Sequence, residues 1–109
     1  MPTHLLFICS RNQWRSPTAE EIYKNDPLYE VRSAGTENST RIRVTEKMIQ
    51  WAEVIFVMEK KHKQRLVEKF PDAMKDKRVE VLDIPDDYQF LDPELAEMIR
   101  LGVQGYFGS

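Results

Sequence analysis

The sequence contains few cysteines, histidines and glycines: one, two and four in 109 residues. A single cysteine excludes an intramolecular disulfide and a metal site built from several cysteines. No apolar run approaches the roughly 20 residues of a membrane-spanning helix. The first apolar run, 5–8, is too short for the core of a secretory signal. We therefore expect a cytoplasmic protein with no metal, no cofactor and no contact with a membrane.

An excess of positive charge is also lacking, because 16 Lys and Arg stand against 18 Asp and Glu. Such a balance gives no general affinity for nucleic acid. The length and a hydrophobic content of 41% fit a single domain, 1–109, with a modest core. Nothing in the sequence requires a dimer, so we expect a monomer. The basic run 60–65 is interpreted as a solvated helix face, with steering of anionic substrates as the alternative.

Short apolar runs alternate with helical segments along the chain. The expected strands are 5–8, 29–33, 54–58 and 79–82, and the expected helices are 17–24, 45–51, 60–70 and one that begins at Pro93 with Asp92 as its cap. This alternation predicts an α/β protein with a parallel sheet and helices on both faces. The tail 102–109 contains three glycines and is expected to be loosely held, although its aromatic residues could pack.

The most informative segment follows the first expected strand, where Cys9 stands six residues before Arg15. Ser16 and Pro17 predict a helix start, with Ser16 as the cap and Pro17 at the first position. The N–H groups and the dipole at a helix N-terminus bind anions and favour a thiolate. Arg15 can hold two phosphate oxygens at once. A nucleophile and a phosphate cradle in one loop therefore predict phosphoryl transfer through a phosphocysteine. A buried, structural Cys9 is disfavoured, because polar residues follow it.

The order of the motifs resembles the low-molecular-weight protein tyrosine phosphatase family. The C-x5-R-S pattern at 9–16 is followed by 33–36, which resembles the family's S-A-G-T segment. The segment 86–88 stands where the family carries its D-P-Y acid loop. The resemblance covers most of the chain and implies a three-layer fold with a four-stranded parallel sheet of order 2-1-3-4, flanked by helices. Both loops would then lie at the carboxyl edge of the sheet, where ligands bind in such folds.

The resemblance also implies the role of each residue in the loop. Cys9 would be the nucleophile, Arg15 and the backbone N–H groups would hold the phosphoryl oxygens, and Ser16 would hydrogen-bond the thiolate. Asn12 is expected in a left-handed conformation, supported by a hydrogen bond with Ser33. The expected substrate-contacting residues are Ser10, Arg11, Asn12, Gln13, Trp14, Arg15 and Tyr88.

The loop after the fourth expected strand supplies the general acid. Alignment on Tyr88 makes Asp86 the acid, which would protonate the leaving group and later activate water. Asp87 replaces the family's proline, so it stays as the second candidate. Tyr88 would wall the pocket and stack on an aromatic substrate.

Three departures from the family weaken the case for phosphotyrosyl peptides. Trp14 stands where many members carry a second cysteine, and the stretch between Thr36 and Val44 is short. The third departure is in the loop, where small or apolar residues are commoner in the family than Ser10, Arg11 and Gln13. We predict a cysteine-dependent phosphomonoesterase, nominally a protein tyrosine phosphatase, which releases inorganic phosphate from a phosphotyrosine protein or a small phosphomonoester. The alternatives are an arsenate reductase that borrows an external thiol, and a phosphate-binding module without catalysis.

Overall fold

A computed structural model describes residues 1–108, and Ser109 of the expected domain lies outside the described residues. Four parallel strands form one sheet in the order β2-β1-β3-β4. They are β1 (Thr3–Cys9), β2 (Tyr29–Gly35), β3 (Val54–Val57) and β4 (Arg78–Val81). The expected parallel sheet of order 2-1-3-4 is confirmed.

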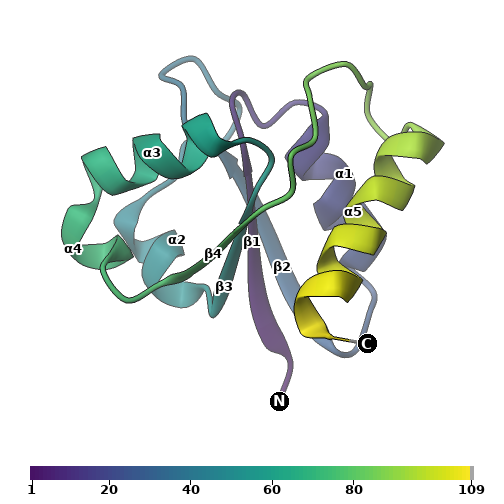
Figure 1. Ribbon diagram of the computed structural model, residues 1–109, viewed down its shortest axis with the longest axis horizontal. Helices are drawn as coiled ribbons and strands as arrows, with labels where there is room; N and C mark the ends of the chain where they lie inside the picture. The colour runs from purple at the N-terminus through teal and green to yellow at the C-terminus, as the bar shows by residue number, and fades with distance from the viewer. Residues whose placement is uncertain (109) are drawn as a thin grey trace.

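Helices cover both faces of the sheet, as Figure 1 shows. One face carries α1 (Arg15–Tyr23) and α5 (Pro93–Phe107), and the other carries α2 (Glu46–Trp51), α3 (Lys60–Lys69) and the short α4 (Pro71–Met74). Side chains of β1 alternate between two apolar clusters, with Leu5 and Phe7 on one face and Leu6 and Ile8 on the other. All four are fully buried, which explains why this central strand is apolar without interruption.

The start of α1 corrects the expectation at Ser16. The helix begins at Arg15 after Trp14, and no side chain caps it. Ser16 therefore lies inside the first turn, and Pro17 is the third helical residue rather than the first. The Ser16 hydroxyl is used elsewhere, in a contact with the Cys9 thiol.

The expectation of a loose tail is wrong for the described residues. Helix α5 begins after the Asp92 cap, as expected, but it continues to Phe107 and ends at Gly108, which has a left-handed φ of 73°. A Cβ at Gly102 would lie 2.4 Å from the Leu82 side chain, so glycine lets the helix pack closely there. The ring of Phe107 lies 5.7 Å from that of Tyr29. This packing outweighs the roughly 1 kcal/mol that each glycine costs a helix.

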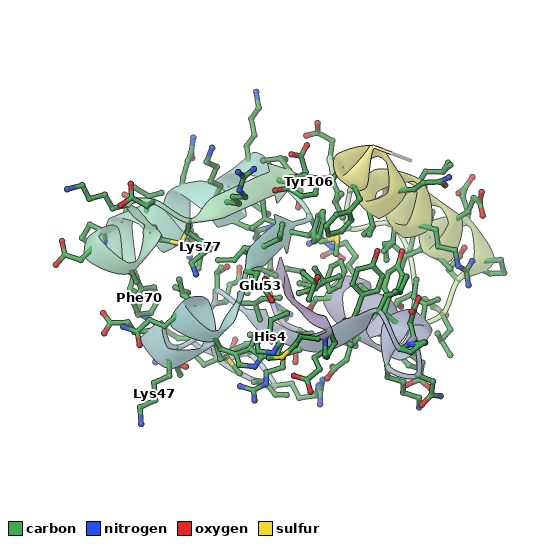
Figure 2. The ribbon with its side chains drawn as sticks, turned by 90° about the horizontal axis from the view of Figure 1, so that it is seen from below. His4, Lys47, Glu53, Phe70, Lys77 and Tyr106 are labelled. Carbon is green, nitrogen blue, oxygen red and sulfur yellow. The ribbon has the colours of Figure 1, made fainter. Side chains whose placement is uncertain are left out.

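The two ends of the sheet differ in what they hold. At the amino-terminal end, Glu53 accepts a hydrogen bond from the N–H of His4 at 2.9 Å, and the two residues lie close together in Figure 2. At the carboxyl end, shown at the top of Figure 1, the loops after β1, β2 and β4 approach one another. Parallel strands bring these loops to one edge, and Cys9 is paired with Gly35 in the last position of its strand.

Candidate active site

The phosphate loop, residues 9–16, turns sharply between β1 and α1. Asn12 has a φ of 54°, a left-handed conformation that asparagine adopts more readily than most residues. This confirms the conformation expected from the sequence. Its backbone N–H reaches back to the Cys9 sulfur, with 3.3 Å between N and Sγ. The loop therefore curls around the thiol instead of leading away from it.

The segment 36–41 binds the carbonyl oxygens of the phosphate loop. Thr36 donates to the carbonyl of Cys9, Glu37 to that of Ser10, and Arg41 to that of Arg11. Gly35 permits this close approach, because a Cβ there would lie 2.7 Å from the Ser10 carbonyl oxygen. Within residues 1–108, the backbone N–H groups of residues 11, 13 and 14 donate to no backbone carbonyl. The free groups of the loop are thus donors, which suits an anion.

A chain of hydrogen bonds determines the direction in which the Ser16 hydroxyl donates. Ser33 donates to the Glu20 carboxylate at 2.6 Å, so Ser33 must accept from the Asn12 amide nitrogen, at 2.9 Å. The same nitrogen donates to Ser16 at 2.8 Å. Ser16 Oγ lies 3.0 Å from Cys9 Sγ, and its other acceptor, the Ala34 carbonyl, is at 3.5 Å. Ser16 can therefore donate to a Cys9 thiolate.

The expected contact between Asn12 and Ser33 is thereby present. Glu20 accepts the last hydrogen bond of this series. The sequence did not identify it, because its position is typical of an ordinary residue on a helix surface. The side chains of Asn12, Ser16 and Ser33 are at most 1% exposed. A buried polar network of this kind holds one arrangement, because each unpaired member would cost free energy.

Arg15 is the largest fully buried side chain of the protein, at 2% exposure. Its Nη1 donates to the Glu59 carboxylate and to the Ile84 carbonyl, each at 2.8 Å. Its Nε lies 3.6 Å from Asp86 Oδ1. Since Nη1 is fully used, Nη2 is the group left for an anion in the pocket. Burial opposes ionisation of Glu59, but the hydrogen bond and charge of Arg15 outweigh it and hold the pKa of that carboxyl below its usual value.

A pocket of about 320 Å³ opens over the thiol. Both Asp86 and Asp87 are exposed, but only Asp86 lines this pocket. The residues that line it are Cys9, Ser10, Arg11, Gln13, Trp14, Arg15, Glu37, Lys61 and Asp86. Glu37 and Lys61 carry no motif that the sequence could have revealed. The geometry favours Asp86 over Asp87 as the group facing the thiol.

Tyr88 does not lie where the sequence predicted. Its ring packs, half-buried, against the apolar cluster between the sheet and α5, and it is not among the residues lining the pocket. A hydrogen bond with Glu94, with burial as a smaller cause, raises the pKa of its hydroxyl. The aromatic residue at the pocket mouth is instead Trp14, which is 42% exposed.

The start of α3 contributes two residues that contact the phosphate loop. Glu59 caps the helix and binds Arg15, and His62 is buried although its neighbours in the basic run 60–65 are exposed. His62 Nε2 lies 2.9 Å from Ser10 Oγ. The interpretation of this run as a solvated face is therefore wrong at His62. The sequence does contain a capping-box spacing, because Glu59 at the N-cap is followed three residues later by His62. The pattern is hard to recognise because histidine replaces the usual glutamate at the third position.

Acid is expected to destabilise the fold through His62. Burial, followed by the charge of Arg15, lowers the pKa of His62 to about 4 from its usual 6.5. Between these values the unfolded chain binds a proton that folded His62 excludes, so the free energy of unfolding falls as the pH drops from 6.5 towards 4. Urea titrations at about pH 7 and pH 4.5 should differ by about 2 kcal/mol. In His62→Gln most of this difference should vanish, and an unchanged difference would contradict the assignment.

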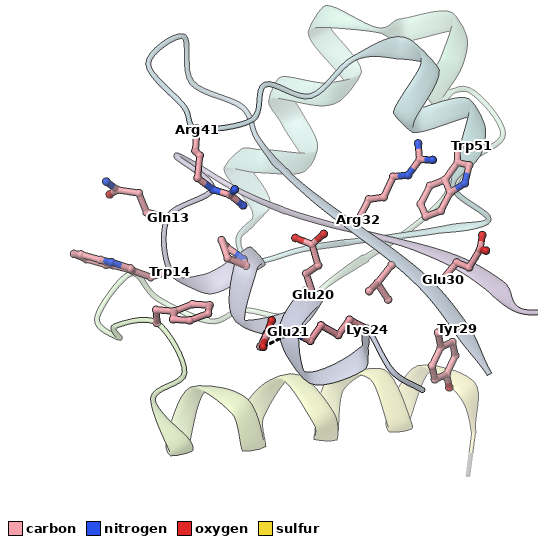
Figure 3. A pocket seen from close by; sticks show the side chains of 13 residues that line it. Gln13, Trp14, Glu20, Glu21, Lys24, Tyr29, Glu30, Arg32, Arg41 and Trp51 are labelled. Atoms are coloured by element: carbon pink, nitrogen blue, oxygen red, sulfur yellow. Dashed lines mark hydrogen bonds and ion pairs between the residues drawn. The ribbon is translucent and has the colours of Figure 1, made fainter. Parts of the chain in front are cut away.

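A second hollow, of about 800 Å³, adjoins the first. Figure 3 shows Glu20 and Glu21 of α1, and Lys24 just after it, on one side of this hollow and Glu30 and Arg32 of β2 on the other. Gln13 and Trp14 line both hollows and so mark their boundary. Among the described residues, no group of three or more His, Cys, Asp or Glu side chains could hold a metal ion. No helix within 1–108 is long and apolar enough to cross a membrane.

Known proteins are similar to this chain in sequence and in fold, although no family model matches. The protein-arginine-phosphatase of Geobacillus stearothermophilus is 34% identical over 101 residues, covering 71% of this chain and 68% of that protein. The structure of the YwlE arginine phosphatase from the same organism has 26% identity and a TM-score of 0.75, with 97% of this chain and 94% of that chain covered.

A more distant structure shows the same fold. SP-PTP, a low molecular weight protein tyrosine phosphatase from Streptococcus pyogenes, has a TM-score of 0.76 at 18% identity, with 96% of this chain and 91% of that chain covered. The sheet order, the C-x5-R-S loop at the carboxyl edge and the relative at 34% identity agree with one another. The chain therefore belongs to the low-molecular-weight protein tyrosine phosphatase family, and it is a phosphatase.

Proposed function

We propose that Cys9, Arg15, Ser16 and Asp86 catalyse hydrolysis through a phosphocysteine. The Cys9 thiolate attacks phosphorus, the S–P bond forms, and the bond from phosphorus to the leaving group breaks. Asp86 gives its proton to the leaving atom, while Arg15 and the loop N–H groups hold the three equatorial oxygens. The observation that carries this proposal is the contact between Cys9 and the Ser16 hydroxyl, above which Arg15 and Asp86 share one pocket.

The second step returns the enzyme to its starting state. Asp86, now ionised, takes a proton from water, and the water oxygen attacks phosphorus. The P–S bond breaks, inorganic phosphate leaves, and Cys9 is again a thiolate, which accepts the hydrogen bond from Ser16. The two alternatives are not favoured. A phosphate-binding module needs neither nucleophile nor acid, and an arsenate reductase needs further thiols, whereas Cys9 is the one cysteine of the sequence.

The substrate is a phosphorylated compound, and we propose a phosphorylated protein. The hollow of Figure 3 supports this, because it continues from the catalytic pocket past Gln13 and Trp14 along the edge of β2, where a polypeptide could lie. Phosphotyrosine is the first candidate residue. Phosphoarginine is the second, supported by the arginine phosphatase at 34% identity and by the Glu37 and Asp86 carboxylates that line the pocket and suit a guanidinium.

The decisive test is hydrolysis by the wild-type protein with a chelator present. We expect turnover of p-nitrophenyl phosphate at pH 5–8 without added metal, and the release of phosphate from one of two matched peptides bearing phosphotyrosine or phosphoarginine. A folded protein that binds inorganic phosphate and hydrolyses none of the three would overturn the proposal. We further propose a monomer working in the cytoplasm, where a reducing environment preserves the lone thiol.

Replacement of the acid should affect poor leaving groups most. In Asp86→Asn, hydrolysis of phenyl phosphate is expected to fall by roughly 10²–10³-fold, because phenolate leaves badly without a proton. Nitrophenolate needs no proton to leave, so its rapid initial burst should survive while steady turnover falls, since the water step still needs a base. Asp87→Asn is the matched control and should stay within about threefold of wild type. The reverse ranking of the two variants would move the role to Asp87.

A further inference from the structure

His62 holds a position that the chemistry above does not use. Its side chain is 1% exposed, on a helix whose flanking residues Lys61 and Lys63 are exposed. Both ring nitrogens have partners: Nδ1 lies 3.0 Å from the backbone nitrogen of Glu59, and Nε2 lies 2.9 Å from Ser10 Oγ. Figure 1 shows the start of α3 at the same edge of the sheet as the end of β1. One buried ring thus connects a helix cap to the phosphate loop.

The backbone determines which ring nitrogen carries the proton. The N–H of Glu59 can only donate, so Nδ1 must accept and be unprotonated. Neutral imidazole then carries its proton on Nε2, and that nitrogen donates to Ser10 Oγ. The ring stays neutral because burial and the charge of Arg15, with smaller contributions from Lys61 and Arg65 and opposition from Glu59, lower the pKa of His62 to about 4.

The Ser10 hydroxyl is consequently an acceptor towards His62 and has one proton of its own to give. Ser10 lines the catalytic pocket beside Cys9. Among the described residues, no acceptor is assigned to that proton, and the nearest anion site is the pocket itself. A hydroxyl that accepts from a buried donor on one side is a good donor on the other, because hydrogen bonds in a chain polarise one another.

We infer that His62 is a positioning residue that turns the Ser10 hydroxyl into a hydrogen-bond donor to the phosphoryl group. The inference rests on the proposed function, because it assigns the anion to the pocket over Cys9. Ser10 then contributes a side-chain donor beside Arg15 and the loop N–H groups. The contact strengthens as negative charge develops on the phosphoryl oxygens, so it acts on both binding and turnover.

Two replacements of His62 separate its two hydrogen bonds. In His62→Asn, the amide oxygen stands near the place of Nδ1 and preserves the helix cap, but no donor reaches Ser10. In His62→Gln, the longer side chain places an amide N–H near the place of Nε2 and preserves the donor to Ser10. Ser10→Ala removes the recipient hydroxyl, and Lys63→Ala, on the same helix and away from the pocket, is the control. Circular dichroism and thermal melting show that each variant is folded.

The readouts are the dissociation constant of inorganic phosphate, by calorimetry, and kcat/KM for p-nitrophenyl phosphate. Ser10→Ala and His62→Asn should each weaken both by about tenfold, as expected for one hydrogen bond to a charged group. The double variant should be no worse than either single one, because both remove the same contact. His62→Gln and Lys63→Ala should stay within about threefold of wild type.

Other results would overturn the inference. A His62→Asn variant with the phosphate affinity and kcat/KM of wild type shows that the hydrogen bond from His62 to Ser10 contributes to neither. Multiplying losses in the double variant show that the two residues act independently, and a His62→Gln variant as weak as His62→Asn shows that His62 acts through packing. Phosphate binding keeps this test separate from the proposed function. If the wild type hydrolyses nothing, the proposed function fails, while the binding constants still decide the role of His62.

Discussion

Replacing Cys9 by serine is expected to abolish turnover while leaving the fold and phosphate binding in place. The hydroxyl of the new serine, at the end of β1, is nearly the same size as the thiol. It can still form a hydrogen bond with the Ser16 hydroxyl. It is far less acidic, and nothing in the phosphate loop can act as a base towards it. Loss of a catalytic nucleophile elsewhere lowers kcat by about six orders of magnitude, which here would put the rate below detection. The measurement is p-nitrophenyl phosphate hydrolysis at saturating substrate.

The control for this variant is its affinity for inorganic phosphate. Binding within a few-fold of wild type shows that the cradle of Arg15 and loop N–H groups survives, and that the lost step is chemical. A Cys9→Ser protein that retains even a tenth of the wild-type turnover would rule out the phosphocysteine. Water would then have to attack phosphorus directly, with Asp86 as its base.

Arg15→Lys should cost about 10³-fold in kcat/KM, although the charge is conserved. The guanidinium divides its work between two sides: Nη1 binds Glu59 and the Ile84 carbonyl, and Nη2 is left for the phosphoryl group. One ammonium cannot reach all these partners from a shorter stem. Removal of a single preorganised donor in other enzymes lowers the rate by about 10²–10³-fold. Loss of the two coplanar N–H groups of Nη2 should therefore cost an amount at the upper end of this range.

The Arg15→Lys variant should also unfold more easily, because it leaves a carboxylate and a carbonyl poorly paired in a buried place. Rates are therefore compared at a temperature well below the melting point of both proteins. Arg78→Lys is the matched control, since Arg78 is exposed at the start of β4, at the far end of the sheet. Activity of Arg15→Lys within tenfold of wild type would show that charge alone is enough and that the fork geometry is not used.

The sequence predicted most of the sheet and of the phosphate loop, because both depend on local patterns. Uninterrupted apolar residues marked β1 and β3, and the spacing from Cys9 to Arg15 marked the loop. The left-handed Asn12 and its contact with Ser33 came from the resemblance to a known loop and are present. These features follow from residues close together in sequence, or from motifs in a fixed order.

The features that were missed depend on packing between distant segments. The four Lys and Arg residues around His62 in the run 60–65 hide one buried position, because only the placement of α3 over the loop shows which side faces inwards. Alignment with the family placed Tyr88 at the pocket wall. Its hydroxyl instead forms a hydrogen bond with Glu94 on α5, and its ring packs against the apolar core. The glycines near the C-terminus suggested a frayed tail, but contacts made by Phe107 hold the helix together through Gly102 and Gly105.

The position of Trp14 gives this protein a built-in optical signal. The sequence has two tryptophans. Trp51 is stacked on His4, with ring centroids 4.5 Å apart. The guanidinium carbon of Arg32, a residue of β2, lies 4.3 Å from the centroid of the Trp51 ring. Trp14 stands 42% exposed at the mouth of the catalytic pocket. Inorganic phosphate that enters the catalytic pocket changes the surroundings of Trp14, whereas Trp51 lines only the second hollow. The intrinsic fluorescence of the unlabelled protein therefore reports phosphate binding at its own active site.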